Sequence, residues 1–167
     1  MHHVVIHTDG GCRKNPGLGS WAFALETQVN DQVFKKQQSQ CYKLTTNNRM
    51  ELMAVIFALK SLTKSCKIDF HSDSKYVIDG IQKKWAANWK KKGWIKSDRK
   101  PAVNIDLWDS LLTQVKKHQI TWHWVKGHSG NPGNELCDLL CNQAMDAKKD
   151  VQVDEYYETP ALAKDFK

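Results

Sequence analysis

The stretch HVVIHTDGGCRKNPGLGSWAFALE, residues 3–26, predicts the first part of a sheet. Residues 3–9 and 20–26 are rich in apolar, β-branched and aromatic side chains, so each is expected to form a strand. The glycine-rich segment between them, residues 10–19, predicts the turn that joins them. A third strand is expected over residues 32–43, and three strands in succession indicate an antiparallel meander.

The clearest helix is predicted between Asn47 and about Lys64. Apolar residues recur there every three or four positions, and Thr45, Thr46 and Asn47 are candidate N-caps. The remaining elements are expected in the order strand 67–71, helix from Ser74, basic segment 83–100, helix 104–117, strand 119–125 and helix from Pro132 or Asn134 to Ala147. The order βββαβαααβα predicts an α/β (mixed α+β) fold in which helices pack on a mixed sheet.

Length and composition predict one globular domain. The chain has 167 residues, of which 41% are hydrophobic and 26% charged, and this excludes a disordered or fibrous protein. It contains no run of 18 apolar residues and no secretory leader, so we expect neither a membrane span nor secretion. The five cysteines are odd in number and scattered, which indicates free thiols in a cytoplasmic protein.

The positive charge is concentrated in one segment. Residues 83–100 contain eight basic residues and one acidic residue, which accounts for the whole net charge of +7. The same segment holds Trp85, Trp89 and Trp94, and a spacing of four places the first two on one face of a helix. Cations with aromatic rings favour nucleic acid as the partner. A membrane surface, or a solvated lysine-rich face whose tryptophans pack inward, would produce the same pattern.

Four acidic residues lie where the predicted elements bring them close to the core or to strand ends. Asp9 ends the first strand, Glu51 lies within the apolar stripe of the first helix, Asp73 follows the strand at 67–71, and Asp138 lies in the last helix. Clustered carboxylates repel one another and are tolerated mainly where cations hold them. Oxygen ligands select Mg²⁺ or Mn²⁺, and two such ions about 3.5 to 4 Å apart support phosphoester cleavage. The acids and the basic segment together indicate a nuclease.

Several blocks of sequence resemble ribonuclease HI, the type 1 ribonuclease H family. They are TDGGCRKNPG at 8–17, TTNNRMELMA at 45–54, SDSKYV at 72–77, NWKKKGW at 88–94, VNIDLW at 103–108 and WVKGHSGNPGNELCD at 124–138. The resemblance runs in register from about residue 3 to residue 147 and implies a ribonuclease H-like fold with a five-stranded mixed sheet flanked by helices. It also implies a metal-dependent endonuclease that hydrolyses the RNA strand of RNA–DNA hybrids and leaves 5′-phosphate and 3′-hydroxyl ends.

The resemblance implies roles for five site residues. Asp9, Glu51, Asp73 and Asp138 would bind Mg²⁺, or Mn²⁺, as two ions once substrate is present. His128 would match the family's mobile histidine, which assists proton transfer or product departure. Gly11 stands where many relatives have Ser, a change that we expect to be tolerated.

The resemblance also implies the contacts with the hybrid duplex. Residues 83–100 would form the family's basic protrusion, which grips the DNA strand through Trp85, Asn88, Trp89, Lys90, Lys91 and Lys92. Thr46 would hold a DNA phosphate, and Asn15, Asn47 and Asn48 would contact the minor groove. Plain turn and cap roles for Asn15 and Asn47 remain the alternative. We expect a monomer, with residues 1–147 as the catalytic domain and 148–167 as a tail partly docked by Tyr156, Tyr157 and Phe166.

Three other functions fit parts of the sequence. A nucleic-acid-binding module whose acids are structural would bind hybrids without metal and cleave nothing. A zinc protein would use Cys137 and Cys141 with His123 or His128. The ribonuclease H domain of a reverse transcriptase would share the motifs, but the chain carries no polymerase sequence.

Overall fold

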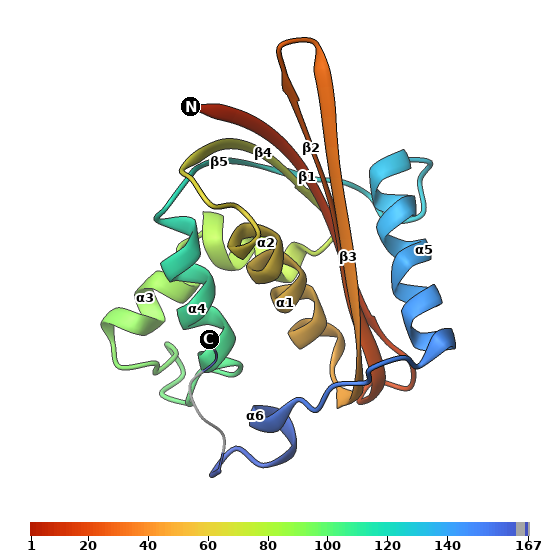
Figure 1. Ribbon diagram of the computed structural model, residues 1–167. Coiled ribbons are helices and arrows are strands. Elements are labelled where there is room, and N and C mark those ends of the chain that lie inside the picture. The colour runs from red at the N-terminus through yellow and green to blue at the C-terminus, as the bar shows by residue number, and fades with distance from the viewer. Residues whose placement is uncertain (163–165, 167) are drawn as a thin grey trace.

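The computed structural model describes residues 1–162 and 166, and it places a five-stranded sheet between helices on both faces (Figure 1). The strands are β1 (His2–Cys12), β2 (Gly17–Val29), β3 (Gln32–Thr45), β4 (Cys66–Ser72) and β5 (Gln119–Trp124). The helices are α1 (Asn47–Lys60), α2 (Lys75–Gln82), α3 (Trp85–Lys91), α4 (Ile105–Val115), α5 (Pro132–Ala147) and α6 (Glu155–Glu158).

The sheet has the order β3-β2-β1-β4-β5. β1, β2 and β3 form the predicted antiparallel meander, whereas β4 and β5 run parallel to β1. The order βββαβαααβα is therefore confirmed from β1 to α5, as is the mixed sheet, and the short helix α6 follows α5 as an additional element. Because β1 and β4 are parallel and paired in register from His2↔Cys66 to Thr8↔Ser72, the residues that follow these pairs emerge at one end of the sheet.

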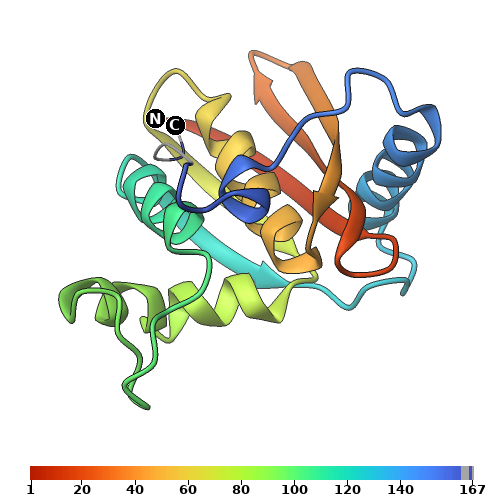
Figure 2. The same ribbon diagram turned by 90° about the horizontal axis from the view of Figure 1, so that it is seen from below.

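Side chains along β1 alternate between the two faces of the sheet, and one of these faces is buried. Val4, Ile6 and Thr8 are buried on one face, which packs against α1. α1 contributes nine buried residues and also packs on α4, so it lies at the centre of the main core. α5 packs on the other face, over β1, β2 and β3 (Figures 1 and 2).

Several boundaries differ from the prediction. β1 and β2 continue pairing through Gly10↔Trp21 and Cys12↔Gly19, so the connecting turn is shorter than residues 10–19. The ladder supplies backbone hydrogen bonds that make up for the low strand propensity of glycine. α1 ends at Lys60, with Ser61 as its C-cap, rather than at Lys64.

The segment after α5 packs on the body of the protein. Gln152 forms a bridge with Tyr42, and Asp154 is 3% exposed. The Phe166 ring lies edge-on to Phe57 at 5.7 Å, and Tyr156 lies over the Arg49 guanidinium, so docking by these two aromatic residues is confirmed. Residues 163–165 and 167 of the predicted tail lie outside the described residues.

Two expectations from composition can be compared with the structure. Among the described residues, no helix has both the length and the apolar character needed to cross a bilayer. All five cysteines are free, as expected.

Candidate active site

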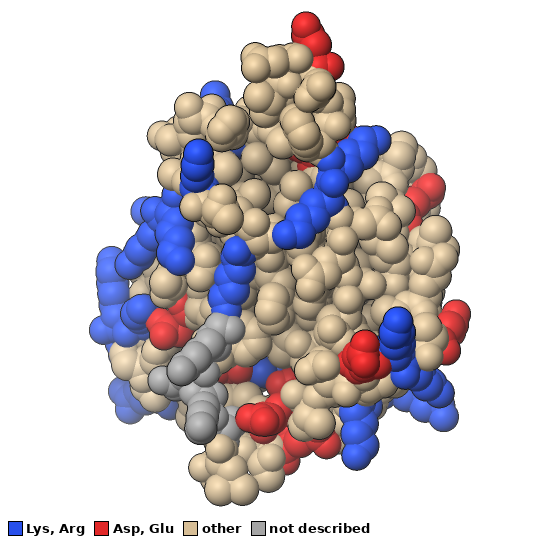
Figure 3. All heavy atoms as spheres, viewed as in Figure 1, with Lys and Arg blue, Asp and Glu red and all other residues tan. Residues whose placement is uncertain are grey.

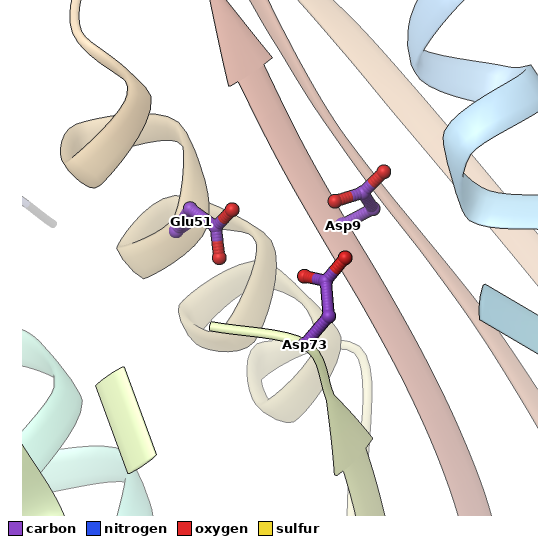
Figure 4. A group of neighbouring side chains, drawn as sticks. All are labelled: Asp9, Glu51 and Asp73. Atoms are coloured by element: carbon purple, nitrogen blue, oxygen red, sulfur yellow. The ribbon is translucent and has the colours of Figure 1, made fainter. Parts of the chain in front are cut away.

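Three of the four predicted acids meet at one end of the sheet. Asp9 lies near the end of β1, Asp73 directly follows β4, and Glu51 lies in the second turn of α1. One carboxylate oxygen from each residue lies within 4.8 Å of the others, and Figure 4 shows the three side chains facing a common point. In the part of the chain that the structure describes, no other three His, Cys, Asp or Glu residues meet this distance.

Gly10 allows α1 to approach the strand that carries Asp9. A Cβ atom at residue 10 would stand 2.5 Å from the backbone nitrogen of Glu51, which real contacts do not allow. The backbone N–H of Gly10 also donates to Oδ1 of Asp9 at 2.9 Å. The glycine that follows Asp9 therefore brings two carboxylates together and orients one of them.

Burial and the charges of neighbouring carboxylates raise the pKa values of two of the three acids, Asp9 and Glu51. Burial, followed by the charge of Asp73, raises the pKa of Asp9 from 3.8 to about 8, although the Gly10 hydrogen bond opposes the shift. The same two causes, burial and neighbouring Asp73, raise the pKa of Glu51 well above its usual value. A cluster with this electrostatics favours a bound cation, because the cation would offset the repulsion.

Asp138 and His128 line the same cavity as the three acids. This cavity measures about 390 Å³, and its other polar walls include Asn47 and Arg13. Asp138 lies on α5 close enough to Asp9 to raise the pKa of that carboxyl, but it stands outside the group of three. His128 is exposed on the loop before α5 with φ at 56°. The structure thus brings all five residues to one cavity, with the three acids at its centre.

The loop that carries His128 is fixed next to Asp73. A Cβ atom at Gly127 would lie 2.8 Å from Oδ2 of Asp73, so the loop passes directly beside that carboxylate. The Trp124 indole N–H donates to the Asp73 backbone carbonyl at 3.1 Å, and Lys75 lies 4.6 Å above the Trp124 ring. Sequence reasoning missed Trp124, because the long-range hydrogen bond leaves no local signal.

Of the predicted minor-groove residues, Asn47 and Asn48 begin α1, Asn15 lies in the loop after β1, and Asn47 lines the cavity. The Asn47 N–H donates to Oδ1 of Asn15 at 3.1 Å, which links the loop after β1 to the helix. Thr46 is the N-cap and accepts a hydrogen bond from the Arg49 N–H at 3.2 Å. Asn48 is exposed. Thr46 and Asn15 thus make cap and turn hydrogen bonds within the chain, and any contact of theirs with a ligand would be additional to these.

The basic segment forms a separate projection built from α3 and the loop after it (Figure 2). Lys and Arg side chains gather over the side of the molecule formed by α3 and α4 (Figure 3). The two tryptophans predicted to contact the DNA strand differ in exposure. Trp85 is 41% exposed, whereas Trp89 packs against Trp108 with ring centroids 6.1 Å apart. Lys90 pairs with Asp109 at 2.7 Å, while Asn88, Lys91 and Lys92 are exposed.

Arg49 forms a buried ionic network that the sequence did not reveal. Its Nε and Nη2 donate to both oxygens of Asp154 at 2.7 and 3.0 Å, and its Nη1 and Nη2 donate to Asp106 at 2.9 and 2.7 Å. Thr45 Oγ1 donates to Asp154 at 2.8 Å. The network joins α1, α4 and the segment after α5, and Arg49 lies two residues before Glu51 in α1.

The proposed zinc ligands do not come together. The thiols of Cys137 and Cys141 lie under α5, where they contact the backbone carbonyls of His7 and Asp9 at 3.3 and 3.6 Å. Burial raises the pKa of Cys137 to about 12, which disfavours the thiolate that binds zinc. The two cysteines are therefore packing residues.

Comparison with known proteins yields consistent matches. A family model described as RNase H matches residues 1–146. A protein named Ribonuclease H from Pseudoalteromonas atlantica is 50% identical over 148 residues, which cover 89% of this chain and 94% of that one. Another from Alcanivorax borkumensis is 48% identical over 153 residues, covering 91% and 97%. The crystal structure of LC9-RNase H1, described as a type 1 RNase H with the type 2 active-site motif, has a TM-score of 0.78 at 26% identity and covers 98% of this chain and 82% of that one.

Proposed function

Since this chain belongs to the RNase H family, we propose that the cavity lined by its four acids is where it hydrolyses the RNA strand of RNA–DNA hybrids. Asp9, Glu51, Asp73 and Asp138 are the metal ligands in this proposal, and His128 is the proton-transfer residue. The observation that carries it is the meeting of three carboxylate oxygens within 4.8 Å at the end of two parallel strands.

The donor set fits a hard divalent cation. All the converging atoms are carboxylate oxygens, which Mg²⁺ and Mn²⁺ prefer over softer ligands. Burial and then repulsion from Asp73 raise the pKa of Asp9, and a cation would offset the repulsion. We assign Mg²⁺ as the working ion, bound as a pair when the hybrid is present. When bound, such ions make a water molecule acidic enough to attack phosphorus and stabilise charge on the leaving oxygen.

The protein's own residues contribute position and proton transfer. Asp9 and Asp73 are held by the paired strands and by the Gly10 and Trp124 hydrogen bonds, so they need little rearrangement to bind. The exposed His128 imidazole lies on a loop that lines the same cavity. In this proposal it transfers a proton to or from the reacting phosphate group. Cleavage by water leaves a 5′-phosphate and a 3′-hydroxyl.

The hybrid binds across two surfaces in this proposal. Asn15, Asn47 and Asn48 contact the minor groove, where 2′-hydroxyl groups distinguish RNA from DNA. Asn47 lines the cavity and donates its backbone N–H to Asn15. Thr46 holds a DNA phosphate near the start of α1. Trp85, Asn88, Trp89 and Lys90 to Lys92 grip the DNA strand from the projecting α3. We also propose that the chain acts as a monomer in the cytoplasm, a reducing compartment that suits its five free cysteines.

Asp9→Asn tests the assignment of the metal ligands. We expect hybrid cleavage to fall by at least about a thousandfold, whereas the affinity for an uncleaved hybrid, measured with Ca²⁺, changes less than about threefold. Asp31→Asn is the matched control, because Asp31 lies in the β2–β3 turn, far along the sheet from the cavity. Cleavage by Asp9→Asn at the rate of the control would overturn the assignment.

A further inference from the structure

A second cluster of metal-binding side chains lies on the sheet face that α5 only partly covers. His3 and His7 on β1, His71 on β4 and His123 on β5 all project from this face, opposite the buried residues of the same strands. His7 pairs with His71 in register, and His71 pairs with His123. Their rings stack with centroids 4.6 and 4.7 Å apart, so three imidazoles form a row across three parallel strands.

Asp69 lies between two of these imidazoles. It pairs in register with Val5 and Thr121, so His3 and His123 are its diagonal neighbours on the two adjacent strands. Diagonal positions are within reach of long side chains. The Nε2 atom of His3 lies 2.5 Å from one carboxylate oxygen, and the Nε2 atom of His123 lies 2.7 Å from the other. These two contacts hold the pKa of Asp69 below its usual range.

The cluster is open to solvent. Side-chain exposure is 53% for His3, 35% for Asp69 and 40% for His123. Among the described residues, no Lys or Arg forms an ion pair with Asp69, so its partners in the structure are the two imidazoles. α5 packs on β1, β2 and β3, whereas the diagonal from His3 to His123 runs toward β5 at the edge of the sheet. An ion with its water molecules can therefore reach all three side chains.

We propose that His3, Asp69 and His123 form a second metal site, which binds one divalent transition-metal ion of the Zn²⁺ or Ni²⁺ class. Two imidazole nitrogens and one carboxylate are a ligand set that such ions accept, with water completing the coordination. Imidazole discriminates against Mg²⁺, so this site and the carboxylate cavity select different ions. In this site each imidazole would offer the lone pair of Nε2 to the ion and carry its proton on Nδ1, and the Asp69 carboxylate would bind as an anion.

Binding of an ion at this site requires a small rearrangement of the His3 and His123 rings. In the hydrogen-bonded arrangement, the two imidazoles stand on opposite oxygens of Asp69, and the three ligand atoms do not all lie within 4.8 Å of one another. Ligand atoms about 2.0 to 2.2 Å from a tetrahedral zinc ion stand roughly 3.3 Å apart. In this proposal the exposed His3 and His123 rings rotate so that both Nε2 atoms and one Asp69 oxygen surround a single ion at this spacing. The ring of His71 stacks on His123 and limits how far that imidazole can turn away.

A bound ion would join β1, β4 and β5 through side chains. β5 is an edge strand, paired only with β4 within the described residues. Because the ligands would be brought together only in the folded chain, binding stabilises the folded state by mass action. The site thus has a readout, thermal stability, that does not depend on nuclease activity.

The test is a calorimetric titration of the full-length protein with ZnCl₂, in millimolar Mg²⁺ so that hard-oxygen sites are occupied. We expect one Zn²⁺ per chain and a higher melting temperature. Asp69→Asn and His123→Gln should each weaken Zn²⁺ binding at least about tenfold. The matched controls are His2→Gln, one residue from His3 on β1, and Asp9→Asn, which alters the catalytic cavity. Both controls should bind Zn²⁺ within about twofold of the unaltered chain.

Each contrary result overturns the proposal in a recognisable way. Full Zn²⁺ binding by Asp69→Asn and His123→Gln would mean that the diagonal cluster is not the site. Loss of binding in Asp9→Asn alone would place zinc in the carboxylate cavity. If Zn²⁺ binding does not saturate at one ion per chain, the histidines bind zinc singly at the surface and do not form one site. The exposed substitutions are expected to leave the metal-free melting temperature almost unchanged, which circular dichroism checks.

Discussion

Asp9 is one of two site residues, with Glu51, whose pKa burial and neighbouring carboxylates raise. Its pKa is about 8 in the metal-free fold against 3.8 ordinarily, so the folded state holds a proton that the unfolded state has lost between these pH values. The unfolding free energy in EDTA should therefore be highest at low pH for this group and fall as pH rises toward 8. We expect Asp9→Asn to remove part of that fall and to stabilise the metal-free protein at pH 8.5 by about 1 to 3 kcal/mol.

Urea unfolding at pH 5.5 and pH 8.5, with EDTA present, measures this effect. Asp31→Asn in the β2–β3 turn is again the control, because Asp31 lies outside the cavity. A pH dependence that is identical in Asp9→Asn and in the unaltered chain would contradict the account of the cluster.

At the residue scale, the sequence predicted the groups that carry chemistry better than the groups that support them. Asp9, Glu51 and Asp73 converge as expected, since Asp9 lies in β1, Glu51 in α1 and Asp73 directly after β4, and the topology sets the positions of these elements. Asp154 lies in the stretch 148–167 that the sequence predicts as a tail, but it is buried against Arg49. Pairing over a separation of 105 residues leaves no periodic signal, so neither partner could be identified from the chain alone.

At the element scale, the segment after α5 stabilises the start of α1. Asp154 and Arg49 are each 2% exposed in their side chains, and removal of one partner leaves a buried charge. We expect Asp154→Ala to lower the unfolding free energy by about 3 to 5 kcal/mol, measured by urea denaturation. Glu155→Ala is the neighbouring control on the exposed side of α6 and should cost no more than about 0.5 kcal/mol. Equal effects of the two substitutions would show that the Arg49 network contributes little.

The α3 projection makes an electrostatic prediction. Lys91 and Lys92 are exposed without an ion-pair partner among the described residues, whereas Lys90 is paired with Asp109. Replacing both Lys91 and Lys92 by Ala should reduce the slope of log affinity against log salt for hybrid binding by up to about 1.8, with kcat nearly unchanged. Lys90→Ala should change the slope by less. An unaltered slope in the double variant would make the projection a solvated surface.

The type of each element could be predicted from the spacing of its apolar residues. The residues at which elements end could be predicted less well. The pairing of β1 with β2 beyond Gly10 depends on the partner strand rather than on local propensity. α6 has only four residues and no amphipathic pattern, so the sequence could not indicate it. Trp85 and Trp89 share a helical face by spacing, but only the surrounding α4 decides that Trp89 becomes part of the packing.

At the scale of the whole molecule, the described fold is held without a disulfide. One core joins β1, β2, β4, α1 and α4, and all five cysteines are free. The midpoint of thermal unfolding in EDTA should therefore be the same, within about 1 °C, with and without a reducing agent. A lower midpoint in the reducing sample would reveal a stabilising disulfide and contradict this account.

The most direct test of the central claim is cleavage of a labelled RNA–DNA hybrid by the full chain. Matched single-stranded RNA, double-stranded RNA and double-stranded DNA serve as controls, each with Mg²⁺ and then with EDTA. We predict that only the RNA strand of the hybrid is cut, that cutting requires the metal ion, and that the products carry 5′-phosphate ends. Binding of the hybrid without cleavage at any Mg²⁺ concentration would contradict the account and leave a nucleic-acid-binding module in its place.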